Sequence, residues 1–495
     1  MISRRTFVSL ALAAAAPRPA WAGPDGRPLV IGLSLRPESL DPTTQSAAVI
    51  GEVVHGNILE GLTWISESGQ AVPLLASRWD VSADRLRYRF HLRDGVRFHD
   101  GAALTPQVVA GAFRRIQSLG HRNKLADTFH NIRQIGTPDG ATVELSLSHP
   151  DPFLPFRLGE SPAVILHPDT AGQASRHPVG TGPYRLVRWD AQGDIELSRW
   201  QDYRQADRTR IDAARFRFIP DPERQVREVL DQRVDLLFRA AAGGAERLAG
   251  SRAHEILLGS SSGKGLLAIN HRRPYLGDVR VRRAIMHAID REAFIRGVLQ
   301  GRGRAIGSHF VPTDPDYINL TALYPYDPDK ARALLREAGV RAPLELDLSL
   351  PPTPYAMAGG PFIIRSLGEV GIRVNPVPVS WSQWMSRVFH QADFDLSLIL
   401  HVEPLDYYIY ARPDYYFGYD SPAFRALVAR HAVSSSPREQ GRLFRDIQRQ
   451  LAEDAVNAWI FTPEVTTVVR KGLKGVQMDY PIFAHDIGSM YWMDG

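Results

Sequence analysis

The sequence predicts a mixed α/β fold, because two kinds of periodicity alternate along it. Residues 85–92 (RLRYRFHL) carry apolar side chains at every second position, which is typical of a strand with one buried face. Other segments open on Thr-Pro, Asp-Pro or Ser-Pro and then repeat apolar residues three or four positions apart, which predicts helices with a capped first turn. A length of 495 residues favours about two to four domains.

The first half of the chain begins with a predicted buried strand at residues 29–35, followed by a loop with two prolines. The strand at 85–92 leads into two Asp-Gly turns that enclose a short run from Val96 to Phe98. Thr105 is then expected to cap a helix that starts with proline.

The second half repeats the same signals. Helices are expected to follow the N-cap residues Asp221, Asp278, Asp327 and Ser436. The helix after Asp278 is expected to continue to about Gly301, and Ser-Pro-Arg-Glu at the last start has the order of a capping box. Predicted strands alternate with these helices at residues 255–258, 265–270, 394–400 and 465–469.

The composition is that of a folded globular protein, with 44% hydrophobic and 23% charged residues. The chain contains no cysteine, which excludes disulfides, a cysteine nucleophile and thiolate-bound metal clusters. Residues 1–22 hold three arginines and no acid, so subtracting them from the net charge of +5 leaves +2. Because there is no basic block or RNA-binding motif, we expect no nucleic-acid partner.

The amino terminus has the order of an export signal: a basic pair, an apolar run and a small-x-small site. Arg4-Arg5 precedes the apolar run 7–16, and Ala20-Trp21-Ala22 predicts cleavage after Ala22. Residues 3–7 (SRRTF) also resemble the twin-arginine motif, which predicts export in the folded state. The alternatives are an organellar presequence and an uncleaved anchor. No later segment has the 18 consecutive apolar residues of a candidate membrane span.

The sequence contains only weak matches to enzyme motifs. Residues 259–263 (GSSSG) match the nucleophile elbow of serine hydrolases in form, but that elbow needs a helix after the serine, and residues 265–270 predict a strand. A serine turn between two strands is therefore favoured over a catalytic Ser261. Gly263-Lys264 lacks the spacing and the hydroxyl residue of a phosphate loop. We predict no catalytic residue and no cofactor.

The segment 403–419 (EPLDYYIYARPDYYFGY) is the most unusual part of the chain, because it holds six tyrosines. Aromatic rings among acids after a predicted buried strand suit a ligand cleft, but a core layer between domains has the same composition. Trp381 and Trp384 carry the same two interpretations.

A histidine and two carboxylates lie close together in the sequence at the start of this segment. His401, Glu403 and Asp406 could supply part of a metal site. Neither H-E-x-x-H nor H-x-H occurs in the chain, however, and we predict no bound metal.

Five blocks, in order, resemble the extracytoplasmic solute-binding proteins of peptide-type ABC importers, the oligopeptide- and dipeptide-binding family. Together they extend over nearly the whole chain after residue 22. The blocks are residues 39–42 (SLDP), 73–79 with 88–105, 178–184 (PVGTGPY), 278–291 (DVRVRRAIMHAIDR) and 326–339.

This resemblance implies an α/β, two-lobed fold of the periplasmic-binding-protein type with an additional inserted domain, three domains in all. Lobe I would be discontinuous and comprise residues 24–58, 175–268 and 468–495, the inserted domain residues 59–174, and lobe II residues 269–467. Such a protein would be a periplasmic monomer without a catalytic group. It would capture a peptide or peptide-like small solute between its lobes and deliver it to the transmembrane subunits of an ABC permease.

In peptide binders of this family, the motif Trp-x-x-Asp-x-x-Asp-Pro follows a strand of the second lobe, and its first aspartate often receives the peptide amine. Glu403 occupies that position here, while Leu400 and Tyr407 replace the tryptophan and the proline. The resemblance therefore implies contact between Glu403 and a cationic group of the solute. The predicted ligand-binding residues are Glu403, His401, Asp406, Tyr407, Tyr408, Trp381, Trp384, Arg36 and Glu38.

Three other functions stay open from the sequence. The same fold could bind a non-peptide ligand, such as an opine, an oligosaccharide or a metal complex, because the family includes such binders. It could also serve signalling without an importer. A secreted serine hydrolase is the remote alternative.

Overall fold

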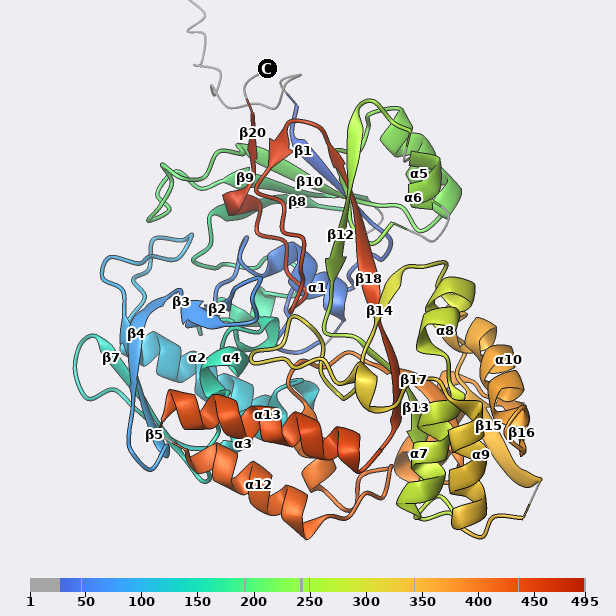
Figure 1. The fold of residues 1–495 in the computed structure, drawn as a ribbon. Helices are drawn as coiled ribbons and strands as arrows, with labels where there is room; N and C mark the ends of the chain where they lie inside the picture. Colours follow the sequence, from blue (N-terminus) through green and yellow to red (C-terminus); the bar gives the residue numbers. More distant parts are fainter. Residues whose placement is uncertain are drawn as a thin grey trace, which may run out of the picture.

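A 12-stranded sheet connects the upper and lower parts of the molecule (Figure 1). The computed structural model describes residues 27–45, 47–190, 193–240, 244–248, 250–341, 343–434 and 436–493, so the predicted export signal lies outside the described residues. Within these ranges, no helix combines the length and the apolar character needed to cross a membrane.

One half of the sheet belongs to the predicted lobe II. Its strands lie in the spatial order β16 (Ile372–Pro378), β15 (Leu344–Leu350), β17 (Leu396–His401) and β13 (Lys264–Ile269), followed by the first part of β18 (Ala458–Arg470), with the short β14 (Gly303–Ala305) also paired to β18. The helices packed around this half are α7 (Val279–Ala288), α8 (Arg291–Val298), α9 (Pro328–Glu337) and α10 (Pro354–Gly368).

The other half of the sheet belongs to the predicted lobe I. Its central pairs, β1 with β10 and β1 with β11, are parallel, and the outer strands are antiparallel. The elements are β1 (Leu29–Leu33), β8 (Tyr184–Trp189), β9 (Ile195–Arg199), β10 (Ala213–Phe218), β11 (Leu236–Leu237), β12 (His254–Ser260), α1 (Ala48–Val54), α5 (Pro222–Leu230) and α6 (Gly244–Leu248). Near the carboxyl terminus, β19 (Leu473–Lys474) pairs with β20 (Tyr491–Trp492).

The chain passes between the two halves twice, and the two passages lie side by side. The residues Ser261 to Gly263 connect β12 of lobe I directly to β13 of lobe II. The long strand β18 pairs with β13 and β14 up to Pro463 and with β12 from Glu464 onward (Figure 1). β13 pairs with β17 and therefore lies in the lobe II half of the sheet. The first passage, at residues 261–263, thus lies a few residues before residue 268, where the lobe I segment was expected to end.

The predicted inserted domain lies beside both halves. Its four-stranded antiparallel sheet has the order β4 (Ala76–Val81), β5 (Arg87–Leu92), β7 (Thr142–Leu147) and β6 (Ile132–Gly136), and β2 (Thr63–Ile65) pairs separately with β3 (Ala71–Pro73). Its helices are α2 (Pro106–Leu119), α3 (Ala126–Asn131) and α4 (Leu154–Arg157). The long helices α12 (Pro422–Val433) and α13 (Pro437–Glu453) lie next to this domain, where Phe444 contacts Phe153 at a ring distance of 5.4 Å (Figure 1).

Buried apolar side chains form three large clusters, one centred in each predicted domain, and a smaller fourth cluster around α5. Three cores of this kind support the division into lobe I, inserted domain and lobe II, which we retain as a proposal.

The predicted period-two strand and most predicted helix starts are confirmed. In β5 the side chains of Tyr88, Phe90 and Leu92 are buried and those of Arg87 and Arg89 are exposed. Each of the N-cap side chains Thr105, Asp221, Asp278 and Asp327 accepts a hydrogen bond from a backbone amide in the first turn of its helix.

Two helix predictions need correction. The segment after Asp278 forms two helices, α7 and α8, because Asp290 accepts a hydrogen bond from the Ala293 amide at 2.9 Å and caps a new helix. At Ser436 only half of the expected capping box forms. The carboxylate of Glu439 accepts a hydrogen bond from the Ser434 hydroxyl at 3.3 Å instead of from the N-cap backbone.

Candidate functional site

A cavity of about 550 Å³ lies between the two lobes, at the place where the chain crosses from one to the other. Both passages contribute to it, through residues 261–263 and 463–466. A volume of this size is typical of a site for a small organic molecule. The remaining lining residues come from lobe I (Glu52, Phe238, Arg239, Ala240, Tyr480, Ile482, Phe483 and His485) and from lobe II (Val298, Leu299, Gln300, Arg302, Pro354, Tyr355, Ala358, Leu400 and Val402).

On the lobe I side, an ion pair stands among aromatic rings. The carboxylate of Glu52 on α1 is buried and accepts a hydrogen bond from the guanidinium of Arg239, which also lies 5.2 Å from the centre of the Phe483 ring. Burial raises the pKa of Glu52, although the attraction of Arg239 opposes this shift. Arg239 has a φ of 48°, a left-handed conformation that costs energy in a residue with a side chain and is often found at functional sites.

His485, on the same side, is the most unusual polar residue of the cavity. Only 3% of it is exposed, and its ring stacks on Phe238. Within the part of the chain that the structure describes, neither ring nitrogen forms a hydrogen bond with a residue outside its own segment. Burial lowers its pKa well below the usual range, and the nearby charge of Arg239 acts in the same direction. The imidazole is therefore neutral and can donate one hydrogen bond and accept another.

The lobe II wall is mostly apolar and is held together by hydrogen bonds to its backbone. The hydroxyl of Tyr355 on α10 accepts a hydrogen bond from the Leu400 amide at 3.0 Å, and Ser262 donates to the Val402 carbonyl at 2.8 Å. Arg302, after α8, donates to the Thr466 hydroxyl at 3.0 Å. Tyr355 thereby fixes the end of β17 against α10, and Ser262 and Arg302 fix the two chain passages against lobe II.

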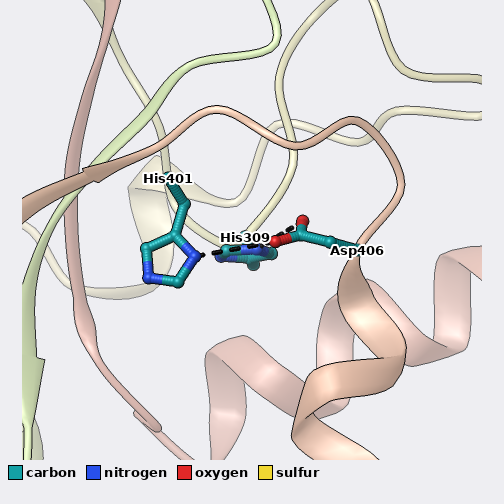
Figure 2. A group of neighbouring side chains, drawn as sticks. All are labelled: His309, His401 and Asp406. Carbon is teal, nitrogen blue, oxygen red and sulfur yellow. Dashed lines mark hydrogen bonds and ion pairs between the residues drawn. The ribbon is translucent and has the colours of Figure 1, made fainter. Parts of the chain in front are cut away.

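A buried polar cluster includes His309, His401 and Asp406 (Figure 2), and His401 directly follows the cavity residue Leu400 at the end of β17. The ammonium group of Lys264, at the start of β13, is 2.9 Å from Asp406 Oδ1, and the same oxygen accepts a hydrogen bond from His309 Nε2 at 2.8 Å. His401 Nδ1 lies 3.6 Å from the other carboxylate oxygen. Burial would raise the pKa of Asp406, but Lys264 and His309 hold it well below its usual range. Burial lowers the pKa of His309 to about 4, so this histidine is neutral.

The same cluster contains the ligand types of a metal site, since His309, His401 and Asp406 have potential ligand atoms within 4.8 Å of one another. The remaining ring nitrogens are already used: His309 Nδ1 is 2.9 Å from the Tyr410 hydroxyl, and His401 Nε2 is 2.8 Å from that of Tyr416. Lys264 already supplies the positive charge that a metal ion would bring. The arrangement therefore fits an internal ion pair with hydrogen-bonded neighbours better than a metal centre.

Several predicted binding residues belong to this cluster or to the core around it. His401, Asp406, Tyr407 and Trp384 are buried, and the Trp384 indole donates to the Ser397 hydroxyl at 3.0 Å. The core interpretation of the tyrosine-rich segment holds for most of its rings, because Tyr407, Tyr410, Tyr416, Phe417 and Tyr419 are all packed inside.

The other predicted residues lie at the surface. Trp381 is 46% exposed, and Tyr408 is 37% exposed with Arg157 5.1 Å from its ring centre. Arg36 and Glu38 are exposed in the loop after β1, where Arg36 lies over the Phe218 ring.

The side chain of Glu403 is 49% exposed, and its carboxylate is 4.0 Å from Lys124 of the inserted domain. The Glu403 carboxylate makes no described contact with Lys264, whereas the backbone carbonyl of Glu403 accepts a hydrogen bond from the Lys264 ammonium group. Lys124 also lines a small neighbouring cavity of about 50 Å³ together with Pro404 and Glu160, whose pKa is raised to about 7 by burial.

None of the nine predicted residues lines the 550 Å³ cavity, and their role in ligand contact stays a prediction. The cavity uses their neighbours Leu400 and Val402 and residues from distant parts of the chain, among them Arg239, Arg302 and His485. The turn 261–263 also lines the cavity, with β13 following it, so the helix that a nucleophile elbow requires is replaced by a strand.

The structure is that of a two-lobed binding protein, because the two lobes share a sheet, the chain passes between them twice, and a cavity lies at these passages. Residues 70–424 match the bacterial extracellular solute-binding proteins, family 5, and the chain belongs to this family.

Individual relatives are distant. The dipeptide-binding protein of Escherichia coli is 25% identical over 349 residues, which cover 64% of this chain and 65% of that protein. The structure of HbpA2 from Haemophilus parasuis has a TM-score of 0.84 at 19% identity, and that of AgaA from A. tumefaciens R10, in complex with agropinic acid, has a TM-score of 0.75 at 23% identity. Both structures match 94% of this chain, with 100% of HbpA2 and 99% of AgaA covered. These likenesses show a shared fold.

Proposed function

We propose that this protein is an extracytoplasmic solute receptor of an ABC importer, which captures a small solute between its lobes and delivers it to the membrane permease. The observation that carries the proposal is the cavity at the two chain passages, whose walls come from both lobes. A solute bound there contacts both lobes at once, so it favours the closed arrangement over the open one.

A peptide or peptide-like solute is the first candidate. The Escherichia coli relative is named a dipeptide-binding protein, and the cavity combines apolar walls with a few polar groups. An opine is the second candidate, because AgaA carries agropinic acid and because Leu400 and Tyr407 depart from the motif of peptide binders.

Solute binding is expected to close the lobes and to change little else. A compact chain of this length should have a radius of gyration of about 23 Å. We expect the protein freed of solute by unfolding and refolding to exceed this value, and the natively purified, solute-loaded protein to approach it. X-ray scattering of the two preparations measures the difference, and native mass spectrometry reports the retained solute. Equal radii for loaded and solute-free protein would contradict a closing receptor.

We retain Glu403 as a proposed contact for a cationic group of the solute, with a smaller effect than a buried carboxylate would have. Its side chain is half-exposed and already faces Lys124, and exposed ion pairs contribute little. Glu403→Gln is therefore expected to weaken binding by about two- to fivefold. Calorimetric titration with solute released from the native protein measures this change. A loss of more than a hundredfold would mean that Glu403 becomes buried on closure.

We also propose that residues 1–22 direct twin-arginine export and that the mature protein is a periplasmic monomer. The basic pair and the A-W-A site support this proposal. The intact mass of protein recovered from the periplasm should correspond to a chain that begins at Gly23. A full-length mass would instead indicate an uncleaved anchor.

A further inference from the structure

A second cavity, of about 350 Å³, lies between the predicted inserted domain and the helices α12 and α13 of the predicted lobe II. It shares no lining residue with the 550 Å³ cavity at the chain passages. Much of its wall is aromatic and consists of Trp79, Tyr88, Phe153, Phe156 and Phe444. A cavity of this size with aromatic walls suits a small organic molecule that contains a ring.

Arg85, in the turn between β4 and β5, brings a positive charge to this cavity. Its partners among the described residues are neutral: the side-chain oxygen of Gln440, which accepts a hydrogen bond from Nη2 at 3.3 Å, and the Tyr88 hydroxyl. The Nε–H of Arg85 is buried and has no acceptor in the same part of the chain. Because a guanidinium carries five N–H donors, Arg85 keeps donors for an anionic acceptor.

The carboxylate in the same wall, that of Asp316, is already paired with another arginine. It accepts a hydrogen bond from Arg445, which is outside the cavity lining. Both Arg85 and Asp316 have left-handed backbone conformations, with φ values of 56° and 52°. Such conformations cost energy in residues with a side chain and are often found at functional sites.

His431, on α12, is a second and independent indication that a polar group of a ligand belongs here. It is 1% exposed and lines the cavity, with its ring centre 5.7 Å from that of Phe153 and 5.3 Å from that of Phe444. Its Nδ1 is 3.1 Å from the Tyr407 hydroxyl, whereas Nε2 has no hydrogen-bond partner among the residues that the structure describes. Buried polar groups are normally hydrogen-bonded.

The electrostatics of His431 connect it to Arg85. Burial lowers the pKa of His431 to about 4, and the positive charge of Arg85 acts in the same direction, so the ring is neutral and the guanidinium lies near it. When the Tyr407 hydroxyl donates to Nδ1, the proton of the neutral ring is on Nε2. His431 can then donate a hydrogen bond to a group that is bound by Arg85.

We propose that this cavity is a second binding site, which takes a small aromatic carboxylate. The carboxylate pairs with Arg85 and accepts hydrogen bonds from His431 Nε2 and the Gln440 amide group, while the ring packs against the aromatic wall. The site uses no residue of the cavity between the lobes, so it goes beyond the proposed capture of a solute there. Because its walls come from the inserted domain and from lobe II, a bound molecule holds these two parts together.

The test compares 3-phenylpropionate with 3-phenylpropionamide, because the two probes differ only in the carboxylate. In calorimetric titrations of the natively purified protein, a charge-assisted hydrogen bond should make the acid bind about tenfold more tightly than the amide, or better. Arg85→Gln should reduce this preference to about threefold or less and leave the affinity for the amide nearly unchanged. Arg87→Gln, an exposed position on β5 outside the cavity lining, is the matched control and should keep the full preference.

Native mass spectrometry then separates the two cavities, because one protein molecule should carry the retained solute and 3-phenylpropionate together. Displacement of the solute by the probe would place the probe between the lobes and overturn the inference. Equal affinities for acid and amide, no binding of either probe at millimolar concentration, or an unchanged preference in Arg85→Gln would overturn it as well. The receptor proposal is judged separately, by lobe closure around the retained solute, so it can survive each of these outcomes.

Discussion

Replacing Lys264 by methionine is expected to lower the free energy of unfolding by about 3–5 kcal/mol, because the change leaves a buried carboxylate without its counter-ion. Lys264 is 1% exposed and Asp406 is 5% exposed, and their charged atoms are 2.9 Å apart. The mutation removes the ammonium group and keeps most of the side-chain volume. Urea unfolding, followed by a signal from the lobe II tryptophans, measures the loss.

A double variant separates a lost ion pair from lost packing. Lys264→Met combined with Asp406→Asn removes both charges and keeps a hydrogen-bonding partner for His309, so we expect it to be more stable than Lys264→Met alone. The control is Lys474→Met, which removes a partly exposed ion pair with Glu255 and should cost about 1 kcal/mol or less. If Lys264→Met cost no more than this control, the Lys264–Asp406 pair would not matter for the fold.

This cluster also explains why the sequence left two interpretations of the segment 403–419 open. Acids, a histidine and tyrosines after a buried strand have the same pattern whether they face a ligand or a core. What decides between the two is Lys264, which lies 142 positions before Asp406 and fills the place beside the carboxylate. No local spacing contains that information.

The cavity itself could not be predicted for a related reason. Its walls combine α1, the segment after β11, the ends of α8 and β17, and residues 480–485 near the carboxyl terminus. None of these stretches has a sequence pattern that indicates a binding site on its own, and only the two chain passages bring them together. The turn at residues 261–263 was predicted as a serine turn between two strands and is confirmed as such, but the sequence did not predict that it passes between the lobes and lines the cavity.

The local elements were more predictable, since their signals act within a few residues. The N-cap side chains Thr105, Asp221 and Asp327 each meet an amide three positions on, so four residues are enough to define the helix start. The break between α7 and α8 was missed because Ile289 continues the apolar pattern, which the capping hydrogen bond of Asp290 outweighs.

The family blocks have a physical meaning that the sequence did not reveal. The block 178–184 (PVGTGPY) returns the chain from the inserted domain to lobe I beside the segment that leaves lobe I. Gly182 and Tyr184 donate from their amides to the carbonyls of Ile58 and Asn57 at 3.1 and 2.9 Å. His99, from the block 88–105, bonds with both glycines, accepting from the Gly180 amide at 3.3 Å and donating to the Gly182 carbonyl at 2.9 Å.

The close approach of these backbones makes Gly180 a position where a single methyl group should be severely destabilising. A Cβ atom on Gly180 would lie 1.9 Å from the Ile58 carbonyl oxygen, and that atom cannot move away as a flexible side chain could. We expect Gly180→Ala to cost about 3 kcal/mol or more, at the upper end of overpacking effects. Thermal unfolding monitored by circular dichroism should show the loss.

Gly172→Ala provides the matched control, because it adds the same methyl group at an exposed position where a Cβ atom meets nothing within 4 Å. This variant should be neutral or more stable by up to about 1 kcal/mol, since alanine restricts the unfolded chain. The difference between the two variants isolates the contact between the outgoing and returning chain segments. If Gly180→Ala melted within a degree of Gly172→Ala, the two segments would be able to separate without loss, and the junction between lobe I and the inserted domain would be held by other contacts.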